Sequence, residues 1–257
     1  MYLITQNIEL FSGYKMAFVN FQNVTLSYPI YNSRGFSVRN QLIRIGTGGL
    51  IESESGHVDH IKALRDITFS IKEGDCVGLI GHNGSGKTTL LRTIGGIYEP
   101  NSGIIEIEGN IATLFDQTAC MEIELSGYDN IRRILLLLGS TKEQAENKIK
   151  EIEEFTELGN FLDLPVRTYS TGMAMRLNFA ISTSLEPEIL LVDEIFEAGD
   201  KSFKEKAKKR INNLISSSKI FIFASHSMEM IKEYCNRIFI LDHGILVEEN
   251  LNYLKDA

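Results

Sequence analysis

The sequence predicts an α/β domain organised around a buried parallel sheet. Three short apolar runs, each followed at once by polar residues, support this prediction: Cys76–Ile80, Ile189–Val192 and Ile220–Ala224. Runs of about four to eight apolar residues bounded by turn signals are typical of strands that are covered on both faces. In such sheets ligands lie beyond the carboxyl ends of the strands. The polar residues after each run are therefore the candidate functional groups.

The segment before the first run predicts strands of a different kind. Phe18–Ser27 and Asp66–Ile71 alternate apolar and polar residues, and a long connection, residues 29–62, joins them. Alternation is the pattern of half-buried strands. The connection contains a candidate short helix, Ser37–Ile45, followed by a glycine-rich joint at Gly46–Gly49.

A phosphate loop is predicted between the run Cys76–Ile80 and a helix at Thr89–Ile94. Residues 81–88 match the pattern G-x-x-x-x-G-K-[ST] at every fixed position. The glycines let the backbone wrap around phosphates, and the helix N-terminus adds partial positive charge. Lys87 is placed to reach the β- and γ-phosphates, and the Thr88 hydroxyl is a magnesium ligand. The predicted nucleotide-binding residues here are Gly81, His82, Asn83, Gly84, Ser85, Gly86, Lys87, Thr88 and Thr89.

The middle of the chain predicts a pair of strands and then helices. Gly103–Ile107 and Ile111–Leu114 are expected to form a hairpin-like pair around the turn residues 108–110. Two helices follow, at Ser126–Leu138 and Lys142–Leu158. Residues 141–144 form a capping box in front of the second helix, because a threonine there precedes a glutamine by three positions.

A turn at Ser170–Gly172 opens a further helix, whose apolar side carries Leu177, Ala180 and Ile181. The serine hydroxyl, the unpaired N–H groups and the helix dipole at such a start form an anion site. Taken alone, the same pattern is that of an ordinary helix N-cap. Both interpretations stay open on these residues alone.

Two carboxylates end the second apolar run. A buried strand at Ile189–Val192 carries Asp193 and Glu194 to the edge of the sheet where ligands bind. Asp193 then suits a magnesium ion or its water, and Glu194 suits a general base that polarises the attacking water. The alternative is a strand followed by an acidic pair that caps a helix.

The order of these motifs resembles that of the nucleotide-binding subunits of ABC transporters, and the resemblance covers residues 18–248. It implies a P-loop NTPase fold of the ABC ATPase type, with an antiparallel β subdomain and an α-helical signature subdomain. Ser170–Met173 then occupies the signature position, where the usual pattern is Ser-Gly-Gly-Gln. The resemblance implies catalytic roles for Glu194 and His226, and nucleotide contacts from Ser170, Gly172 and Asp200.

Departures from the usual motifs resemble one branch of that family. The Tyr-Ser-x-Gly-Met form at residues 169–173, and the segment 193–200, which lacks a proline after its glutamate, are similar to those of O-antigen and teichoic-acid exporters. We therefore expect an ATP-hydrolysing subunit that powers export of an O-antigen-like, lipid-linked polysaccharide through a separate permease. The alternatives are the ATPase of another ABC exporter, for teichoic acid, a drug or a lipoprotein, and a soluble ABC ATPase without a transport role.

Two positions in the predicted site stay open between pairs of residues. The family places an amide or acidic side chain after the strand Ile111–Leu114, and either Asp116 or Gln117 supplies that magnesium-directed oxygen. The family also places an aromatic ring against adenine. Tyr28 is favoured over His60 because it follows the first strand, and the alternative is that Tyr28 is a half-buried residue at a strand end.

The resemblance also implies cofactors, partners and boundaries. ATP and Mg²⁺ are the expected cofactors, and a second copy of the chain is expected to supply Ser170 and Gly172 in a head-to-tail dimer. Residues 116–126 are expected to seat a short helix of a membrane permease, unless their apolar residues pack internally. The predicted regions are an N-terminal extension at 1–15, an ATPase domain at 16–248 with an insertion at 29–62 and a helical subdomain at about 118–172, and a tail at 249–257.

Composition sets limits on the class of protein. A net charge of −8 over 257 residues disfavours general nucleic-acid binding, which draws its affinity from phosphate neutralisation. No apolar run approaches the roughly 20 residues of a membrane span, and residues 1–16 lack the core of a signal peptide. Three widely spaced cysteines predict reduced thiols. We expect a protein held at the cytoplasmic side of the plasma membrane by its permease, with a tail too short for direct glycan binding.

Overall fold

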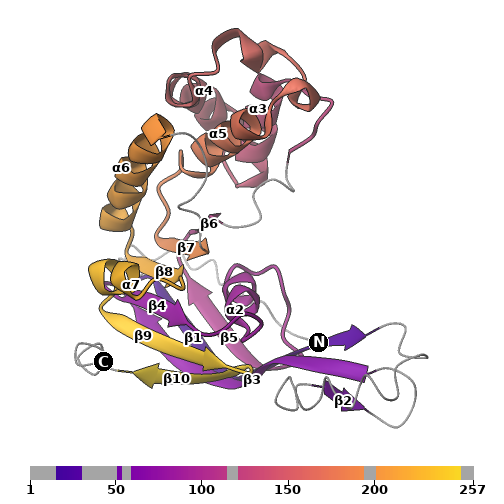
Figure 1. The fold of residues 1–257 in the computed structure, drawn as a ribbon, viewed down its shortest axis with the longest axis vertical. Helices are drawn as coiled ribbons and strands as arrows, with labels where there is room; N and C mark the ends of the chain where they lie inside the picture. Colours follow the sequence, from indigo (N-terminus) through magenta and orange to yellow (C-terminus); the bar gives the residue numbers. More distant parts are fainter. Residues whose placement is uncertain (1–15, 31–50, 54–58, 115–120, 194–200, 250–257) are drawn as a thin grey trace, which may run out of the picture.

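The computed structural model describes residues 16–30, 51–53, 59–114, 121–193 and 201–249, and its strands lie below a separate group of helices in Figure 1. The strands form two sheets, one of four strands in the order β2-β3-β1-β5 and one of six in the order β10-β9-β4-β8-β7-β6. This arrangement confirms the predicted α/β fold with an antiparallel part and a helical part.

The smaller sheet is antiparallel and carries the N-terminal strands. It contains β1 (Phe18–Ile30), β2 (Ile51–Ser53), β3 (Asp59–Lys72) and β5 (Ser102–Glu108). Val19 and Phe21 are fully buried, whereas the neighbouring Phe18 is exposed, as the alternation of side chains along a strand requires. Both long strands run further than the sequence predicts, because the β1–β3 ladder continues to the pair Ile30 and Asp59.

The larger sheet carries the site. Its parallel strands are β4 (Cys76–Ile80), β6 (Ile111–Leu114), β7 (Ile189–Asp193), β8 (Ile220–Ala224) and β9 (Arg237–Asp242), and β10 (Ile245–Glu249) joins the edge antiparallel to β9. The three strands predicted from apolar runs, β4, β7 and β8, are confirmed and lie side by side with β8 in the middle.

The predicted hairpin between Gly103–Ile107 and Ile111–Leu114 is wrong. Its first strand, β5, pairs with β1 in the antiparallel sheet, while its second, β6, pairs in parallel with β7 in the other sheet. Gly109, with φ +123, turns the chain between the two sheets, and the Asn110 carbonyl accepts hydrogen bonds from the backbone N–H groups of Glu188 and Ile189. The turn residues thus connect two sheets, because β5 pairs with β1 and β6 pairs with the apolar strand β7.

Some helices lie against the larger sheet, while the helical segments between residues 127 and 182 form the separate helical group in Figure 1. The helical segments are α2 (Lys87–Ile94), α3 (Gly127–Leu137), α4 (Lys142–Thr156), η3 (Gly159–Asp163), η4 (Val166–Thr168), α5 (Thr171–Ser182), α6 (Lys201–Ser217) and α7 (Met228–Tyr234). The predicted capping box of α4 is confirmed, since Thr141 and Gln144 bond reciprocally. Within the described ranges, no helix has the length and apolar character that crossing a membrane requires.

Side chains from α6 fasten the helical group to the rest of the fold. Lys206 Nζ donates to Glu157 Oε1 at 2.7 Å, and Arg210 pairs with Glu151 of α4. The Arg210 guanidinium also lies 4.6 Å from the centroid of the Phe155 ring. These cations are therefore committed to the α4–α6 contact, in which charge and aromatic packing act together.

Asn130 holds the segment that enters α3. Its side chain is fully buried and makes four hydrogen bonds, accepting from the Glu122 N–H and donating to the carbonyls of Glu122, Leu125 and Ser126. We expect Asn130→Ala to lower the free energy of unfolding by about 2 kcal/mol, because it leaves several partners unpaired. Chemical denaturation of both proteins measures this.

A matched comparison separates this effect from ordinary loss of one helix cap. Thr141→Ala removes a single exposed cap bond from α4, and about 1 kcal/mol is expected. An Asn130→Ala loss no larger than the Thr141→Ala loss would show that the buried network adds nothing.

Candidate nucleotide-binding site

The phosphate loop connects β4 to α2 and depends on its glycines. Gly84 and Gly86 have φ angles of +81 and +112, in the left-handed region that side chains avoid. A Cβ on Gly81 would lie 2.5 Å from Ser85 Oγ and 2.3 Å from the Leu241 carbonyl oxygen. The loop therefore folds back on itself so tightly that only a residue without a side chain fits at its start.

Polar groups inside the loop have the chemistry of a phosphate cradle. Lys87 is buried, and its Nζ donates to the carbonyls of Gly81 at 2.7 Å and His82 at 3.3 Å. The Ser85 hydroxyl is also buried and has no hydrogen-bond partner among the described residues. A buried cation and an unsatisfied hydroxyl at the N-terminus of α2 fit a bound anion.

A pair of oxygens adjoins the loop at the end of β7. The Thr88 hydroxyl donates to Asp193 Oδ2 at 2.8 Å, although 105 residues separate them. Hydroxyl and carboxylate oxygens are the hard ligands that Mg²⁺ prefers, so the pair fits a magnesium site. The structure thus brings together two of the predicted metal residues, while Asp116 and Gln117 lie outside the described residues, as do the predicted Glu194 and Asp200.

His226 follows β8 on the same edge of the sheet. Ala224, the last residue of β8, pairs with Asp193 in the parallel ladder, so His226 lies just beyond the strand that neighbours β7. The Ser225 hydroxyl accepts a hydrogen bond from the Ser227 N–H at 3.0 Å, which shapes the turn into α7. The ends of β7 and β8 therefore converge on one edge, as the sequence predicts.

Tyr28 adjoins the helix that follows the loop. Its hydroxyl donates to Thr89 Oγ1 at 3.4 Å, and its ring meets Tyr98 edge-on with centroids 5.4 Å apart. Arg92 donates to the Tyr98 hydroxyl at 3.1 Å. Burial raises the pKa of the Tyr28 hydroxyl above its ordinary value. His60 lies in the β1–β3 ladder, and which of the two rings meets adenine stays a prediction.

Ser170 and Gly172 lie in another part of the molecule. Ser170 is the N-cap of α5, and its hydroxyl accepts from the Met173 N–H at 3.2 Å. Both Ser170 and Gly172 are exposed, and α5 belongs to the helical group while α2 lies among the sheets in Figure 1. The structure therefore does not bring this helix start to the phosphate loop of its own chain.

Two features beside the loop were not predicted. One is Tyr98, for which the sequence offers only a weak signal, namely an aromatic residue just beyond the helix that follows the loop. The other is the turn between β9 and β10, where Asp242 Oδ1 lies 3.1 Å from His82 Nε2 and the His243 ring centroid is 4.7 Å from that of His82. No spacing in the sequence reports this contact, because 160 residues separate His82 from Asp242.

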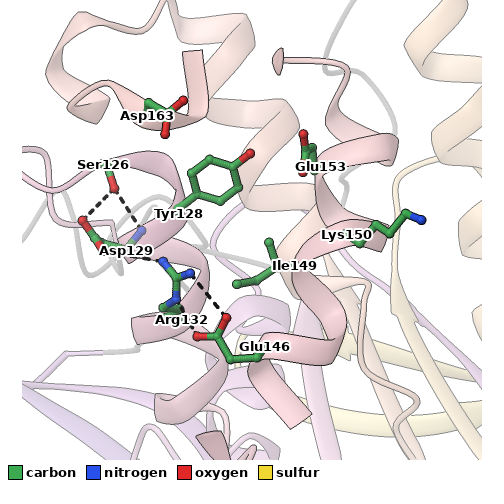
Figure 2. Close-up of a pocket in the computed structure, with 9 residues that line it drawn as sticks. All are labelled: Ser126, Tyr128, Asp129, Arg132, Glu146, Ile149, Lys150, Glu153 and Asp163. Atoms are coloured by element: carbon green, nitrogen blue, oxygen red, sulfur yellow. Dashed lines mark hydrogen bonds and ion pairs between the residues drawn. The ribbon is translucent and has the colours of Figure 1, made fainter. Parts of the chain in front are cut away.

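A pocket of about 530 Å³ lies in the helical group between α3 and α4, and Figure 2 shows the side chains that line it. Arg132 Nε donates to Glu146 Oε1 at 2.6 Å, which ties the two helices together. The remaining lining residues are Ser126, Tyr128, Asp129, Ile149, Lys150, Glu153 and Asp163. Four carboxylates against two cations give the pocket an acidic character.

Comparisons with known proteins agree with this site. Residues 64–197, more than half of the chain, match the ABC transporter family model. The O-antigen export system ATP-binding protein RfbE of Yersinia enterocolitica is 58% identical over 234 residues, which is 91% of this chain and 98% of that protein. The teichoic acids export ATP-binding protein TagH of Lactococcus lactis is 40% identical over 76% of this chain, but only 42% of that protein is covered.

Solved structures share the fold. A dimeric ATP-binding cassette in a post-hydrolysis state, bound to ADP and Pi, superposes with a TM-score of 0.66 at 22% identity, over 91% of this chain and 98% of the other. The ATP-binding subunit of another ABC transporter superposes with a TM-score of 0.67 at 20% identity, over 93% and 92%. On the family match and the 58% identity, the chain belongs to the ABC transporter family.

Proposed function

We propose that this protein is the ATP-hydrolysing subunit that powers export of a cell-surface polysaccharide, of the O-antigen kind, through a separate membrane permease. The observation that carries the ATPase part is the hydrogen bond between Thr88, at the end of the phosphate loop, and Asp193, at the end of β7. The polysaccharide part is supported by the relative from Yersinia enterocolitica, whose identity of 58% exceeds the 40% found for a teichoic-acid relative.

Each residue of the proposed site has a distinct task in the reaction. The loop N–H groups and Lys87 bind the phosphates, and Thr88 and Asp193 hold Mg²⁺, which offsets phosphate charge when bound. Glu194 follows Asp193 directly and accepts a proton from the attacking water. His226, at the end of the neighbouring strand, contacts the γ-phosphate side of the same site.

The proposed active unit is a head-to-tail dimer. Ser170 and Gly172 are exposed on the helical group, remote from the phosphate loop of their own chain, so a second chain is needed to bring them to the nucleotide. A solved structure of the same fold is dimeric and bound to ADP and Pi, which supports a dimer as the active unit. Closure on ATP and opening after hydrolysis then supply the motion that a permease uses.

The permease contact is proposed on the helical group, at residues 121–126 and the adjoining pocket. Ile123 is 55% exposed, whereas Met121 packs partly against the core, so the segment combines both uses that the sequence left open. The acidic pocket beside Ser126 in Figure 2 favours basic side chains on the partner. We infer that the protein is held at the cytoplasmic face of the membrane through this partner.

The magnesium assignment predicts a specific loss. Thr88→Val keeps the side-chain shape but removes the oxygen, so the tighter binding of ATP in the presence of Mg²⁺ should disappear, whereas Thr88→Ser should keep it. Titration of both variants with a fluorescent ATP analogue, with magnesium and with a chelator, measures the difference. A Thr88→Val protein that retains the full magnesium effect would place the ion elsewhere.

The transport role is tested in the host cell. Deleting the gene should leave the polysaccharide inside the cell on its carrier, and a plasmid copy should restore it to the surface. The Lys87→Ala copy should fail to restore it, although the protein is made. Normal surface polysaccharide in the deletion strain, with ATPase activity intact in the purified protein, would leave the enzyme assignment standing and remove the transport assignment.

A further inference from the structure

We propose that His82, Asp242 and His243 form a binding site for a transition-metal cation of the zinc class beside the phosphate loop. Each of the three residues offers one ligand atom, and these atoms all lie within 4.8 Å of one another. The Asp242 Oδ1 atom is 3.1 Å from His82 Nε2 and 3.7 Å from His243 Nε2. Two ligand atoms bound to one tetrahedral zinc ion at its usual bond lengths are about 3.3 Å apart, which these two separations bracket.

The hydrogen bond at the other nitrogen of His82 prepares that ring for a metal. His82 Nδ1 lies 2.8 Å from the Asn83 carbonyl oxygen, which can only accept, so Nδ1 carries the proton. In the neutral ring the lone pair is then on Nε2, and it faces the Asp242 carboxylate. A proton on Nε2, or a metal cation in its place, makes this contact favourable. Metal-binding histidines are usually oriented in this way, by donation from the second nitrogen to a carbonyl.

The ligand types select the cation. Two imidazoles and one carboxylate suit zinc and its neighbours in the first transition row, whereas Mg²⁺ prefers oxygen alone. The Thr88–Asp193 pair offers only oxygens, so the two sites are chemically distinct. The side chains of His82, Asp242 and His243 are 48%, 70% and 33% exposed, so an ion enters from solvent and water completes its coordination.

Backbone hydrogen bonds hold the phosphate loop, which carries His82, close to the turn that carries Asp242 and His243. The Gly244 N–H donates to the Ser85 carbonyl at 2.9 Å, and the Gly244 carbonyl accepts from the Arg65 N–H at 2.8 Å. The turn between β9 and β10 is therefore already bonded to the phosphate loop next to the cluster. His243 itself has φ +46, a left-handed conformation that places its ring on the side of His82. A bound ion would add a second link between loop and turn.

Calorimetric titration with zinc chloride tests the site in the full chain, after chelation and without nucleotide. Excess Mg²⁺ in the buffer occupies the oxygen-rich site. We expect one zinc ion per chain, and at least about tenfold weaker binding in His243→Asn and in Asp242→Asn. Asparagine is chosen at position 243 because it tolerates the left-handed conformation. The matched control, His60→Asn, removes a histidine of β3 and should bind zinc as the parent does.

Cobalt(II) provides a spectroscopic check that does not depend on affinity. The parent should show the visible absorption of four-coordinate cobalt with nitrogen ligands, and His243→Asn should lose it. Equal zinc affinity in the parent and both variants would overturn the proposal and direct attention to Cys76 and Cys235 as ligands. Absence of saturable binding in the parent would overturn it as well. Both results concern zinc affinity alone, because the titration is carried out without nucleotide.

Discussion

Glu194→Gln is expected to bind MgATP as tightly as the parent and to hydrolyse it about 10²–10⁴-fold more slowly. The amide has nearly the same size as the carboxylate but cannot accept the proton of the attacking water. Glu194 directly follows Asp193 in the sequence, and Asp193 ends β7 and accepts a hydrogen bond from Thr88 at 2.8 Å. Single-turnover hydrolysis and nucleotide titration together separate the chemical step from binding.

The control for this variant is Glu186→Gln, which makes the same chemical change on an exposed residue before β7. It should hydrolyse ATP at the parent rate. Turnover by Glu194→Gln within a few-fold of the parent would mean that another group is the base. The slow variant should also accumulate as an ATP-bound dimer, which light scattering detects.

Ser170→Arg is expected to abolish ATP hydrolysis while each chain still binds ATP. Ser170 is exposed at the N-terminus of α5, so a longer side chain fits in the monomer. In the head-to-tail dimer the same side chain would enter the γ-phosphate side of the opposite site and prevent closure. ATPase activity and ATP affinity of the purified variant measure the two effects separately.

Ser126→Arg is the matched control, because Ser126 is also a serine N-cap in the helical group, that of α3. Both variants lose a cap worth about 1 kcal/mol, but only the change at Ser170 should stop hydrolysis. Mixing Ser170→Arg with Lys87→Ala chains should recover at most one competent site per heterodimer, the site that combines Lys87 of one chain with Ser170 of the other. Full activity of Ser170→Arg alone would contradict the shared site.

Local patterns predicted the phosphate loop and its neighbouring strands because these parts are short and continuous. The phosphate loop and the strands β4, β7 and β8 each occupy a few consecutive residues, and the rule that ligands lie at carboxyl ends of strands brought Thr88 and Asp193 together. The antiparallel strands were located but underestimated in length. Their extension past residues 27 and 66 depends on pairing with each other, which neither segment signals alone.

The wrong hairpin and the unpredicted contact between His82 and Asp242 have one physical origin. The hairpin was predicted because two strands close in sequence usually pair, yet β6 is apolar enough to be buried beside β7. The approach of Asp242 to His82 likewise joins residues 160 positions apart. Contacts of this kind are decided by how the strands order themselves in the sheets, and a single sequence carries no periodicity that records it.

The strand order also governs when the nucleotide site forms on the ribosome. β4, which leads into the phosphate loop, has β8 and β9 as its neighbours, and Cys76 pairs with Phe221 while Val77 pairs with Arg237. A nascent chain that has not yet reached β8 therefore presents β4 with both edges unpaired, and one edge stays unpaired until β9 is made. Such non-local pairing slows folding and exposes the growing chain to aggregation. ATP affinity should consequently appear late in synthesis, so that nucleotide binding reports a completed chain rather than an emerging one.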